Sequence, residues 1–192
     1  MTNSSVREQL LKLLRQEALE FKDVILSSGR RSNYYIDCRR VTLSAMGAYL
    51  TAKLVMQHLS PQTVDAIGGL TLGADPIVAA VAAISYQEGH PIHAFIVRKK
   101  AKDHGHQYLI EGSYLAQRAR VAIIDDVVTS GNSIIKAIRI VQQQTDWQIA
   151  RVMCLVDRQE GARKLLARKG YELSVLFTWD ELIFPYQIDW NK

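Results

Sequence analysis

Segments typical of strands and of helices alternate along the chain from Val64 to Phe177. This alternation favours a mostly parallel sheet with helices on both faces, because parallel strands need a crossover connection that is usually a helix. The stretches VAIIDD (Val121–Asp126) and CLVD (Cys154–Asp157) lack polar alternation, as expected for strands with two buried faces. The sequence therefore predicts the α/β class.

Hydrophobic periodicity, residue propensity and turn residues predict the individual elements. The predicted helices are about Ser5–Leu19, Ser44–Leu59, Asp75–Gln87, Asn132–Gln144 and Gly161–Arg168. The predicted strands are Asn33–Cys38, Val64–Leu70, Ile92–Val97, Val121–Asp126, Ala150–Asp157 and Tyr171–Phe177. The polar stretch Arg98–Ser113, with its two glycines, is predicted to be a loop.

The composition suits one domain with a hydrophobic core. The chain has 192 residues, of which 48% are hydrophobic and 22% charged, and this argues against general disorder. The net charge of +5 agrees with nucleic acid, membrane surfaces or small anions as partners. Cys38 and Cys154 lie far apart in sequence, which predicts reduced thiols in a cytoplasmic protein. No secretory signal is evident and no apolar run approaches the roughly 18 residues of a membrane span.

Two adjacent carboxylates, Asp125 and Asp126, end a predicted buried strand, and a turn rich in hydroxyl groups follows them, Thr129–Ser133. This turn leads into a helix N-terminus, where unpaired backbone N–H groups suit a phosphate. The carboxylates would repel a phosphate, so we expect them to accept hydrogen bonds from sugar hydroxyls or to face a divalent cation. The combination suits a sugar phosphate.

Two other interpretations of this segment stand beside that one. Aspartate and serine are ordinary helix caps, so the segment also fits a simple acidic capping turn. A response-regulator pocket also ends a strand with two aspartates, although the hydroxyl-rich turn argues against it. The Walker pattern GxxxxGK[ST] is absent.

The stretch VAIIDDVVTSGNSI resembles the phosphoribosyl-pyrophosphate (PRPP) signature of the type I phosphoribosyltransferases. Three further stretches, FKDVILSSGRRSNYYIDCRR, VRKKAKDHG and LVDRQEGA, resemble orotate phosphoribosyltransferases in order and spacing. The resemblance implies a parallel five-stranded core (about residues 41–177) and a small hood (mainly residues 1–40 plus the C-terminal segment). It also implies Mg²⁺ dependence, a homodimer with shared active sites, and transfer of phosphoribose from PRPP to orotate in pyrimidine biosynthesis.

A run of cations, Arg98, Lys99, Lys100 and Lys102, begins the predicted loop, and His104 follows. Such a loop fits a lid whose charges stabilise a departing pyrophosphate. A solvated basic loop and a nucleic-acid patch are the alternatives, and the interleaved aromatics that the second requires are missing.

The resemblance also assigns site residues. It implies that Lys102, His104, Asp125 and Asp126 are catalytic, with Lys102 and His104 reaching the neighbouring subunit's site. The implied PRPP-binding residues are Thr71, Leu72, Gly73, Arg98, Lys99, Lys102, His104, Asp125, Asp126, Val127, Val128, Thr129, Ser130, Gly131, Asn132 and Ser133. The implied orotate-binding residues are Thr129, Arg158, Tyr35 and Ile36. Direct ligation of Mg²⁺ by side chains is not predicted, since PRPP would hold the ion with the two aspartates nearby.

The planar fork of Arg158 suits the orotate carboxylate, although an ion pair with Glu160 would explain the same residue. Two positions depart from some members of the family. Ser27 stands where these carry a lysine in the hood, and Thr71-Leu72 replaces an aromatic–lysine pair. Neither lysine contact is expected here. Two rival functions are a phosphoribosyltransferase for another base and a PRPP-sensing regulator without turnover; we expect neither a nucleic-acid nor a membrane partner.

Overall fold

The computed structural model describes residues 3–20, 24–25, 31–32, 34–59, 64–100 and 108–184. Its helices are α1 (Asn3–Leu13), α2 (Arg39–Thr42), α3 (Ala45–His58), α4 (Asp75–Gln87), α5 (Asn132–Gln144), α6 (Ala162–Arg168) and α7 (Trp179–Ile183), and a π-helical turn, η1 (Leu14–Ala18), extends α1. Its strands are β1 (Leu19–Glu20), β2 (Val24–Ile25), β3 (Arg31–Ser32), β4 (Tyr35–Ile36), β5 (Ala66–Leu70), β6 (His93–Val97), β7 (Ile110–Gly112), β8 (Arg120–Val128), β9 (Gln148–Asp157) and β10 (Leu173–Thr178).

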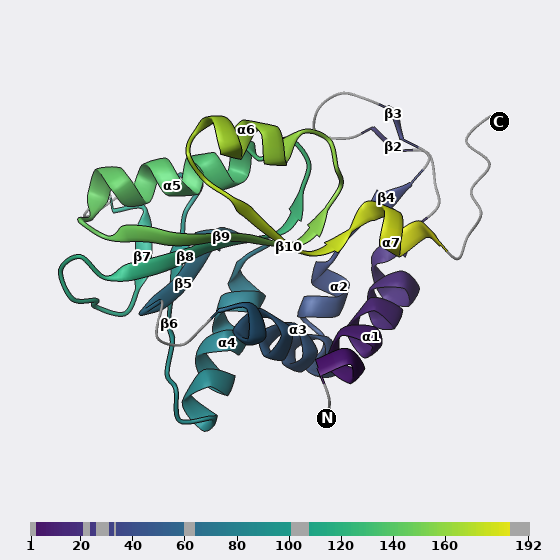
Figure 1. Cartoon of the computed structure of the whole chain (residues 1–192), viewed down its shortest axis with the longest axis horizontal. Coiled ribbons are helices and arrows are strands. Elements are labelled where there is room, and N and C mark those ends of the chain that lie inside the picture. The colour runs from purple at the N-terminus through teal and green to yellow at the C-terminus, as the bar shows by residue number, and fades with distance from the viewer. Residues whose placement is uncertain are drawn as a thin grey trace.

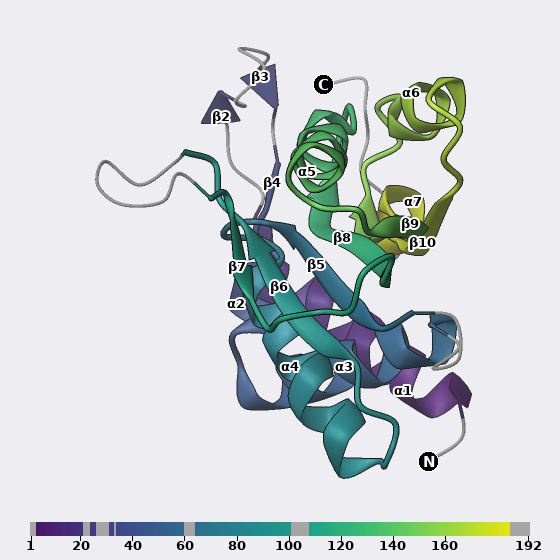
Figure 2. The same ribbon diagram turned by 90° about the vertical axis from the view of Figure 1, so that its left-hand side faces the viewer.

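A six-stranded sheet in the order β10-β9-β8-β5-β6-β7 forms the centre of the molecule. The first five of these strands are parallel to their neighbours, and this confirms the predicted mostly parallel five-stranded core. Helices α5 and α6 cover one face, and α1, α3 and α4 cover the other (Figures 1 and 2). Two buried clusters correspond to these faces, one around Leu10, Leu50 and Ile77 and the other around Phe95 and Ile138.

The sixth strand corrects the prediction that Arg98–Ser113 is a loop throughout. Strand β7 pairs antiparallel with β6, with Gly112 opposite Phe95 and Ile110 opposite Val97. Leu109 and Ile110 pack against the second core cluster. This burial stabilises a strand too short to give a recognisable period in a polar segment.

Two short helices are also absent from the predictions. Helix α2 begins where the predicted strand Asn33–Cys38 was expected to end, and within the described residues of that range the strand β4 covers Tyr35–Ile36. The Asp37 carboxylate accepts the backbone N–H of Arg39 and turns the chain into this helix. Helix α7 begins at a capping box in which Thr178 and Glu181 cap each other's backbone N–H groups.

The sheet reverses its order between β5 and β8. Strand β5 pairs with β6 on one side and with β8 on the other. Helix α4 follows β5 onto one face and α5 follows β8 onto the opposite face (Figure 1). The loops that leave the carboxyl ends of β5 and β8 therefore diverge, and ligands of parallel α/β sheets bind at such a point.

The N-terminal segments lie beside the end of the described chain. The guanidinium of Arg7 on α1 donates to the carbonyl oxygen of Leu176 at 3.1 Å and pairs with Glu181. Strands β1 and β4 pair antiparallel, and so do β2 and β3. The division into a hood and a core stays a prediction, and residues 185–192 of its C-terminal segment lie outside the described residues.

Candidate active site

The segment Thr129–Ser133, which comprises the turn after β8 and the first two residues of α5, borders a cavity of about 260 Å³ and is called the hydroxyl turn below. Gly131 has a φ of 85°, a left-handed conformation that favours glycine. The next loop holds the turn in place, since Arg158 donates its backbone N–H to Val128 (2.8 Å) and Ala162 to Thr129 (3.2 Å). Hydroxyl groups and the first N–H groups of α5 thus converge on a cavity that suits an anion.

The acid pair, Asp125 and Asp126, lies at the carboxyl end of β8. Asp125 is buried with 7% of its surface exposed. Burial and the neighbouring Asp126 charge raise the pKa of Asp125, and burial raises the pKa of Asp126. Each carboxylate accepts the next backbone N–H, from Asp126 at 3.1 Å and from Val127 at 2.9 Å. The pair is therefore held rigidly in a position where positive charge or hydroxyl donors would stabilise its ionised form.

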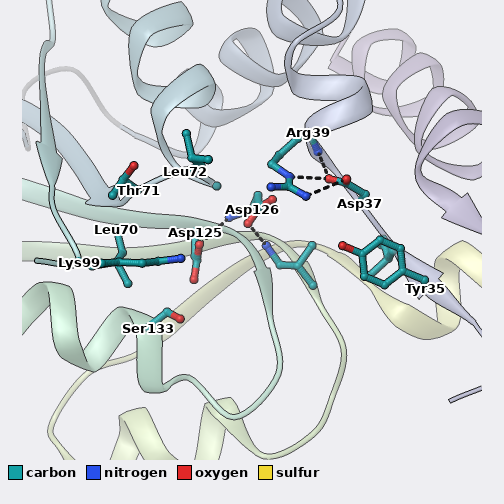
Figure 3. A pocket seen from close by; sticks show the side chains of 13 residues that line it. Tyr35, Asp37, Arg39, Leu70, Thr71, Leu72, Lys99, Asp125, Asp126 and Ser133 are labelled. Atoms are coloured by element: carbon teal, nitrogen blue, oxygen red, sulfur yellow. Dashed lines mark hydrogen bonds and ion pairs between the residues drawn. The ribbon is translucent and has the colours of Figure 1, made fainter. Parts of the chain in front are cut away.

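A second cavity of about 370 Å³ extends from the acid pair towards the loop after β5 (Figure 3). The backbone of Thr71–Gly73 approaches the acid pair closely, and a Cβ on Gly73 would lie 2.1 Å from Asp126 Oδ1. Lys99, from the loop after β6, points towards Asp125, and its charge partly opposes the rise that burial causes in the pKa of Asp125 (Figure 3). Three strand ends thus contribute to one cavity, as the switch point predicts.

Asp37 and Arg39, between β4 and α2, form a further wall of this cavity. Arg39 donates from Nε to Asp37 Oδ1 (2.7 Å) and from Nη2 to Asp37 Oδ2 (2.9 Å). Its guanidinium lies beside Asp126 (Figure 3). The hydrogen bonds from Arg39 lower the pKa of the Asp37 carboxyl.

Arg158 lies in a different environment, directly after β9. Its guanidinium carbon is 4.8 Å from the ring centroid of Tyr34 and 5.9 Å from that of Trp179, and these two rings stack at 4.1 Å. Nη2 pairs with Glu160 at 3.0 Å, while the buried Nε has no hydrogen-bond partner among the described residues. We call Tyr34, Arg158 and Trp179 the arginine–aromatic cluster.

The structure gathers most of the predicted site residues around the two cavities. The larger cavity is lined by Tyr35, Ile36, Thr71, Leu72, Gly73, Lys99, Asp125, Asp126, Val127 and Ser133. The smaller one is lined by Asp125, Val127, Val128, Thr129, Ser130, Gly131, Asn132 and Ser133. The roles assigned to these residues stay predictions.

Four predicted residues are not among those that line these cavities. Arg98 instead pairs with Glu111 of β7 at 3.3 Å. Arg158 belongs to the arginine–aromatic cluster, and the alternative ion pair with Glu160 is present, although the arginine is buried and not at the surface. Lys102 and His104 lie outside the described residues.

Sequence reasoning missed Asp37, Arg39, Tyr34 and Trp179. The pattern D-x-R at Asp37–Arg39 is a short-range signal for a carboxylate–guanidinium pair at a helix start, but it does not indicate which cavity the pair faces. No local signal joins Tyr34 to Trp179, since 145 residues, 179 − 34, separate them.

The acid pair also fits a magnesium ion. The described residues contain no cluster of three or more histidine, cysteine, aspartate or glutamate side chains that would enclose a metal. Mg²⁺ commonly takes one or two protein carboxylates and completes its shell with water and substrate phosphate oxygens. Asp125 and Asp126, whose ionised forms are disfavoured by burial, suit such an ion.

Comparisons with known proteins agree closely with this architecture. No family model matches the chain. The chain is 44% identical to the orotate phosphoribosyltransferase of Thermosynechococcus vestitus over 179 residues, which cover 93% of this chain and 94% of that protein. The Synechocystis orotate phosphoribosyltransferase is also 44% identical, covering 96% of this chain and 92% of that protein.

Solved structures give the same result. The crystal structure of Mycobacterium tuberculosis orotate phosphoribosyltransferase with Fe(III) dicitrate is 37% identical, with a TM-score of 0.80 over 92% of this chain and 98% of that one. The complex of the same enzyme with PRPP has a TM-score of 0.76 at 34% identity and the same coverage. With this identity over nearly the whole length, the chain belongs to the orotate phosphoribosyltransferase family.

Proposed function

We propose that this chain is a pentosyltransferase that transfers the phosphoribosyl group of PRPP to orotate, giving orotidine 5′-monophosphate and pyrophosphate in pyrimidine biosynthesis. The observation that carries the proposal is the position of the acid pair between two cavities. Asp125, Val127 and Ser133 border both cavities, so the cavity at the hydroxyl turn adjoins the cavity that Lys99 lines. A phosphorylated sugar with a second anionic group fits this arrangement.

The substrate is oriented by the chemistry of the cavity walls. The 5-phosphate binds the hydroxyl turn, where backbone N–H groups and hydroxyls donate. Asp125 and Asp126 accept hydrogen bonds from the ribose hydroxyls. The diphosphate then extends towards Thr71–Gly73 and Lys99, because these residues also line the larger cavity.

The reaction is a displacement at C1′ in which the bond to pyrophosphate breaks as the bond to the orotate nitrogen forms. Positive charge develops on the sugar and negative charge on the leaving group. The acid pair would stabilise the first of these charges and Lys99 the second. Lys102, His104 and Arg98 would add cations from a lid over the leaving group, with greater effect on the transition state than on substrate binding.

The family's Mg²⁺ would lie at the diphosphate, with Asp125 and Asp126 nearby. When bound, it neutralises phosphate charge and assists departure of pyrophosphate. The two carboxylates hold the ribose hydroxyls, and the nearby cation would favour their ionised forms despite burial.

Recognition of orotate is assigned to Arg158, with Thr129 and the main chain of Tyr35 and Ile36 bordering the base. The supporting observation is the buried Nε of Arg158, which has no hydrogen-bond partner in the described part of the chain and leaves donor capacity after the contact with Glu160. An orotate carboxylate would satisfy it, since arginine forks match carboxylates.

A homodimer with shared sites is also part of the proposal. Leu43 and Leu72 expose 71% and 62% of their surfaces and line a neighbouring cavity of about 540 Å³, and Met46 on helix α3 exposes 52% of its surface. Exposed apolar side chains of this kind suit contact with a second copy. Such an interface would let the partner's lid residues enter the site.

A cytoplasmic location is proposed from the two buried thiols. Cys38 and Cys154 are free. Unpaired cysteines are the rule in a reducing compartment. No helix in the described part of the chain is long and apolar enough to cross a membrane.

The decisive experiment for the activity follows orotate absorbance with and without PRPP and Mg²⁺. We expect the protein to reduce the absorbance of orotate only when PRPP and Mg²⁺ are both present. Binding of PRPP without turnover would instead support the regulator. Lys102→Ala should lower kcat by about 10²–10³-fold, the usual cost of losing one transition-state donor, with little change in PRPP affinity.

Mixing two inactive variants tests the shared site. Lys102→Ala and the double variant Asp125→Asn/Asp126→Asn should regain activity together, because a mixed dimer holds one site with both intact parts. Mixed dimers, verified by differential tagging, that stay inactive would exclude sharing.

A further inference from the structure

Arg39 lines the larger cavity, although the family resemblance assigns it no role. It belongs to the first turn of α2 and lines the larger cavity with Thr71–Gly73 and Lys99. Its side chain keeps 41% of its surface exposed. A cation in this position is accessible to a ligand without rearrangement of the core.

Asp37 fixes the orientation of this cation. The carboxylate takes hydrogen bonds from Nε and Nη2 of Arg39 and also from the Arg39 backbone N–H at 3.1 Å. One edge of the guanidinium is therefore occupied, while Nη1 pairs with no described residue. A guanidinium group held in this orientation loses less conformational entropy on binding an anion than a mobile arginine side chain does.

The larger cavity contains few positive charges besides Arg39 among its described residues. Of the described residues that line it, only Arg39 and Lys99 carry positive charge, against Asp37, Asp125 and Asp126. The loop Thr71–Gly73 contributes no basic side chain to the cavity. Among the described residues that line the cavity, Arg39 and Lys99 are therefore the cations that a diphosphate could contact.

We propose that Arg39 binds the diphosphate of PRPP and the pyrophosphate product through its free Nη1 edge, and that Asp37 is the positioning residue that aims it. The inference rests on the proposed function, because that function places a diphosphate beside Thr71–Gly73. Arg39 supplies the charge that the Thr71-Leu72 loop lacks. Its guanidinium lies beside Asp126, one of the two aspartates proposed to hold the ribose hydroxyls (Figure 3).

The alternative is a structural role in which Arg39 merely stabilises the start of α2 through Asp37. The two roles differ in ligand dependence. A structural role would weaken every ligand and lower stability, whereas a diphosphate role weakens only ligands with a diphosphate. Orotidine 5′-monophosphate carries the ribose, base and 5-phosphate without the diphosphate, so it is the matched ligand.

The test uses calorimetry with inorganic pyrophosphate plus Mg²⁺ and, separately, orotidine 5′-monophosphate. Arg39→Gln should weaken pyrophosphate binding by about tenfold, as expected for one charged hydrogen bond at a partly exposed site. Orotidine 5′-monophosphate binding should change less than about twofold by the same arithmetic. The control Arg40→Gln alters the neighbouring arginine, which pairs with Glu20, and should leave both affinities unchanged.

Two further variants keep the test decisive if Arg39→Gln fails to fold. Arg39→Lys retains charge without the fork, and Asp37→Asn retains an acceptor for the helix start without the ion pair. Both should weaken pyrophosphate binding by a smaller factor and spare orotidine 5′-monophosphate. Unchanged pyrophosphate binding, or equal losses for both ligands, would overturn the role of Arg39. A wild-type protein that binds neither ligand would instead overturn the proposed function on which it rests.

Discussion

The hydroxyl turn with its acid pair and the arginine–aromatic cluster are built in opposite ways. The first is one continuous segment, Asp125–Ser133, whose shape comes from a strand end, a left-handed glycine and a helix N-terminus. The second joins Tyr34, Arg158 and Trp179 from three separate parts of the chain. Here Gln159 holds the segments together, exchanging hydrogen bonds with Asp180 (3.0 and 3.2 Å).

This difference suggests a division of tasks. Phosphate and ribose are common to all phosphoribosyl transfers, and a rigid local motif suffices to bind them. The base differs between such reactions, and side chains assembled from distant segments can vary without disturbing the sheet. We therefore expect substitutions in the two regions to affect different substrates and to differ in their stability costs.

Asp125→Asn should give the largest effect and increase stability. Burial raises the pKa of Asp125 from 3.8 to about 8, so the folded protein loses stability as the pH rises between these values. Asparagine does not titrate, so the variant should gain on the order of a few kcal/mol over wild type from about pH 4 to about pH 9. Urea unfolding at both pH values measures this gain. The control is Asp146→Asn, because the carboxylate of Asp146 is exposed. An equal gain in stability for this control would refute the attribution of the gain to the buried carboxyl of Asp125.

Arg158→Ala changes the arginine–aromatic cluster and should weaken the binding of orotate. Charged hydrogen bonds contribute about 1.5–3 kcal/mol, which corresponds to a 10- to 150-fold weaker affinity for orotate. PRPP affinity should stay within about twofold. Calorimetry on both ligands decides the point, with Arg151→Ala at an exposed position of strand β9 as the control. Unchanged orotate affinity would leave Glu160 as the functional partner of Arg158.

Gly131→Ala should destabilise the protein by about 1–2 kcal/mol, because a left-handed backbone disfavours a side chain. The added Cβ would also lie 3.3 Å from Ala162 Cβ and press on the hydroxyl turn. Gly170→Ala is the matched control, since its φ is 82° and nothing lies within 4 Å of its Cβ. Both variants should lose similar stability in urea, but only Gly131→Ala should weaken PRPP binding. Equal PRPP affinities would show that the turn does not bind phosphate.

Tyr34→Leu should give the smallest effect. It removes the stack on Trp179 and the ring beneath Arg158, an interaction of about 0.5–1.5 kcal/mol. Orotate affinity should fall about 2- to 13-fold, with PRPP affinity unchanged. Leucine in place of exposed Tyr86 is the control for the loss of an aromatic residue. An equal loss of PRPP affinity would contradict the proposal that the two regions bind different substrates.

Much of the core follows from the sequence alone. Helices α4 and α5 begin and end at the predicted residues, because Asp75-Pro76 and the hydroxyl turn mark their starts and amphipathic patterns give their lengths. The buried strands β8 and β9 follow from apolar runs that end in aspartate. The acid pair and hydroxyl turn are contiguous, so their geometry depends mainly on local backbone preferences.

Only the tertiary structure decided which distant residues meet. Strand β7 exists because β6 offers an unpaired edge, and Arg39 faces the cavity because Asp37 turns the chain into α2 beside Asp126. Arg158 packs against Tyr34 and Trp179 because β4 and α7 come together beyond the end of β9. Local propensity carries no information on such contacts, since their stability comes from burial and charge shared between segments far apart in sequence. The sequence thus determined the acid pair and the hydroxyl turn, and the packing of segments far apart in the chain decided the surroundings of Arg158 and Arg39.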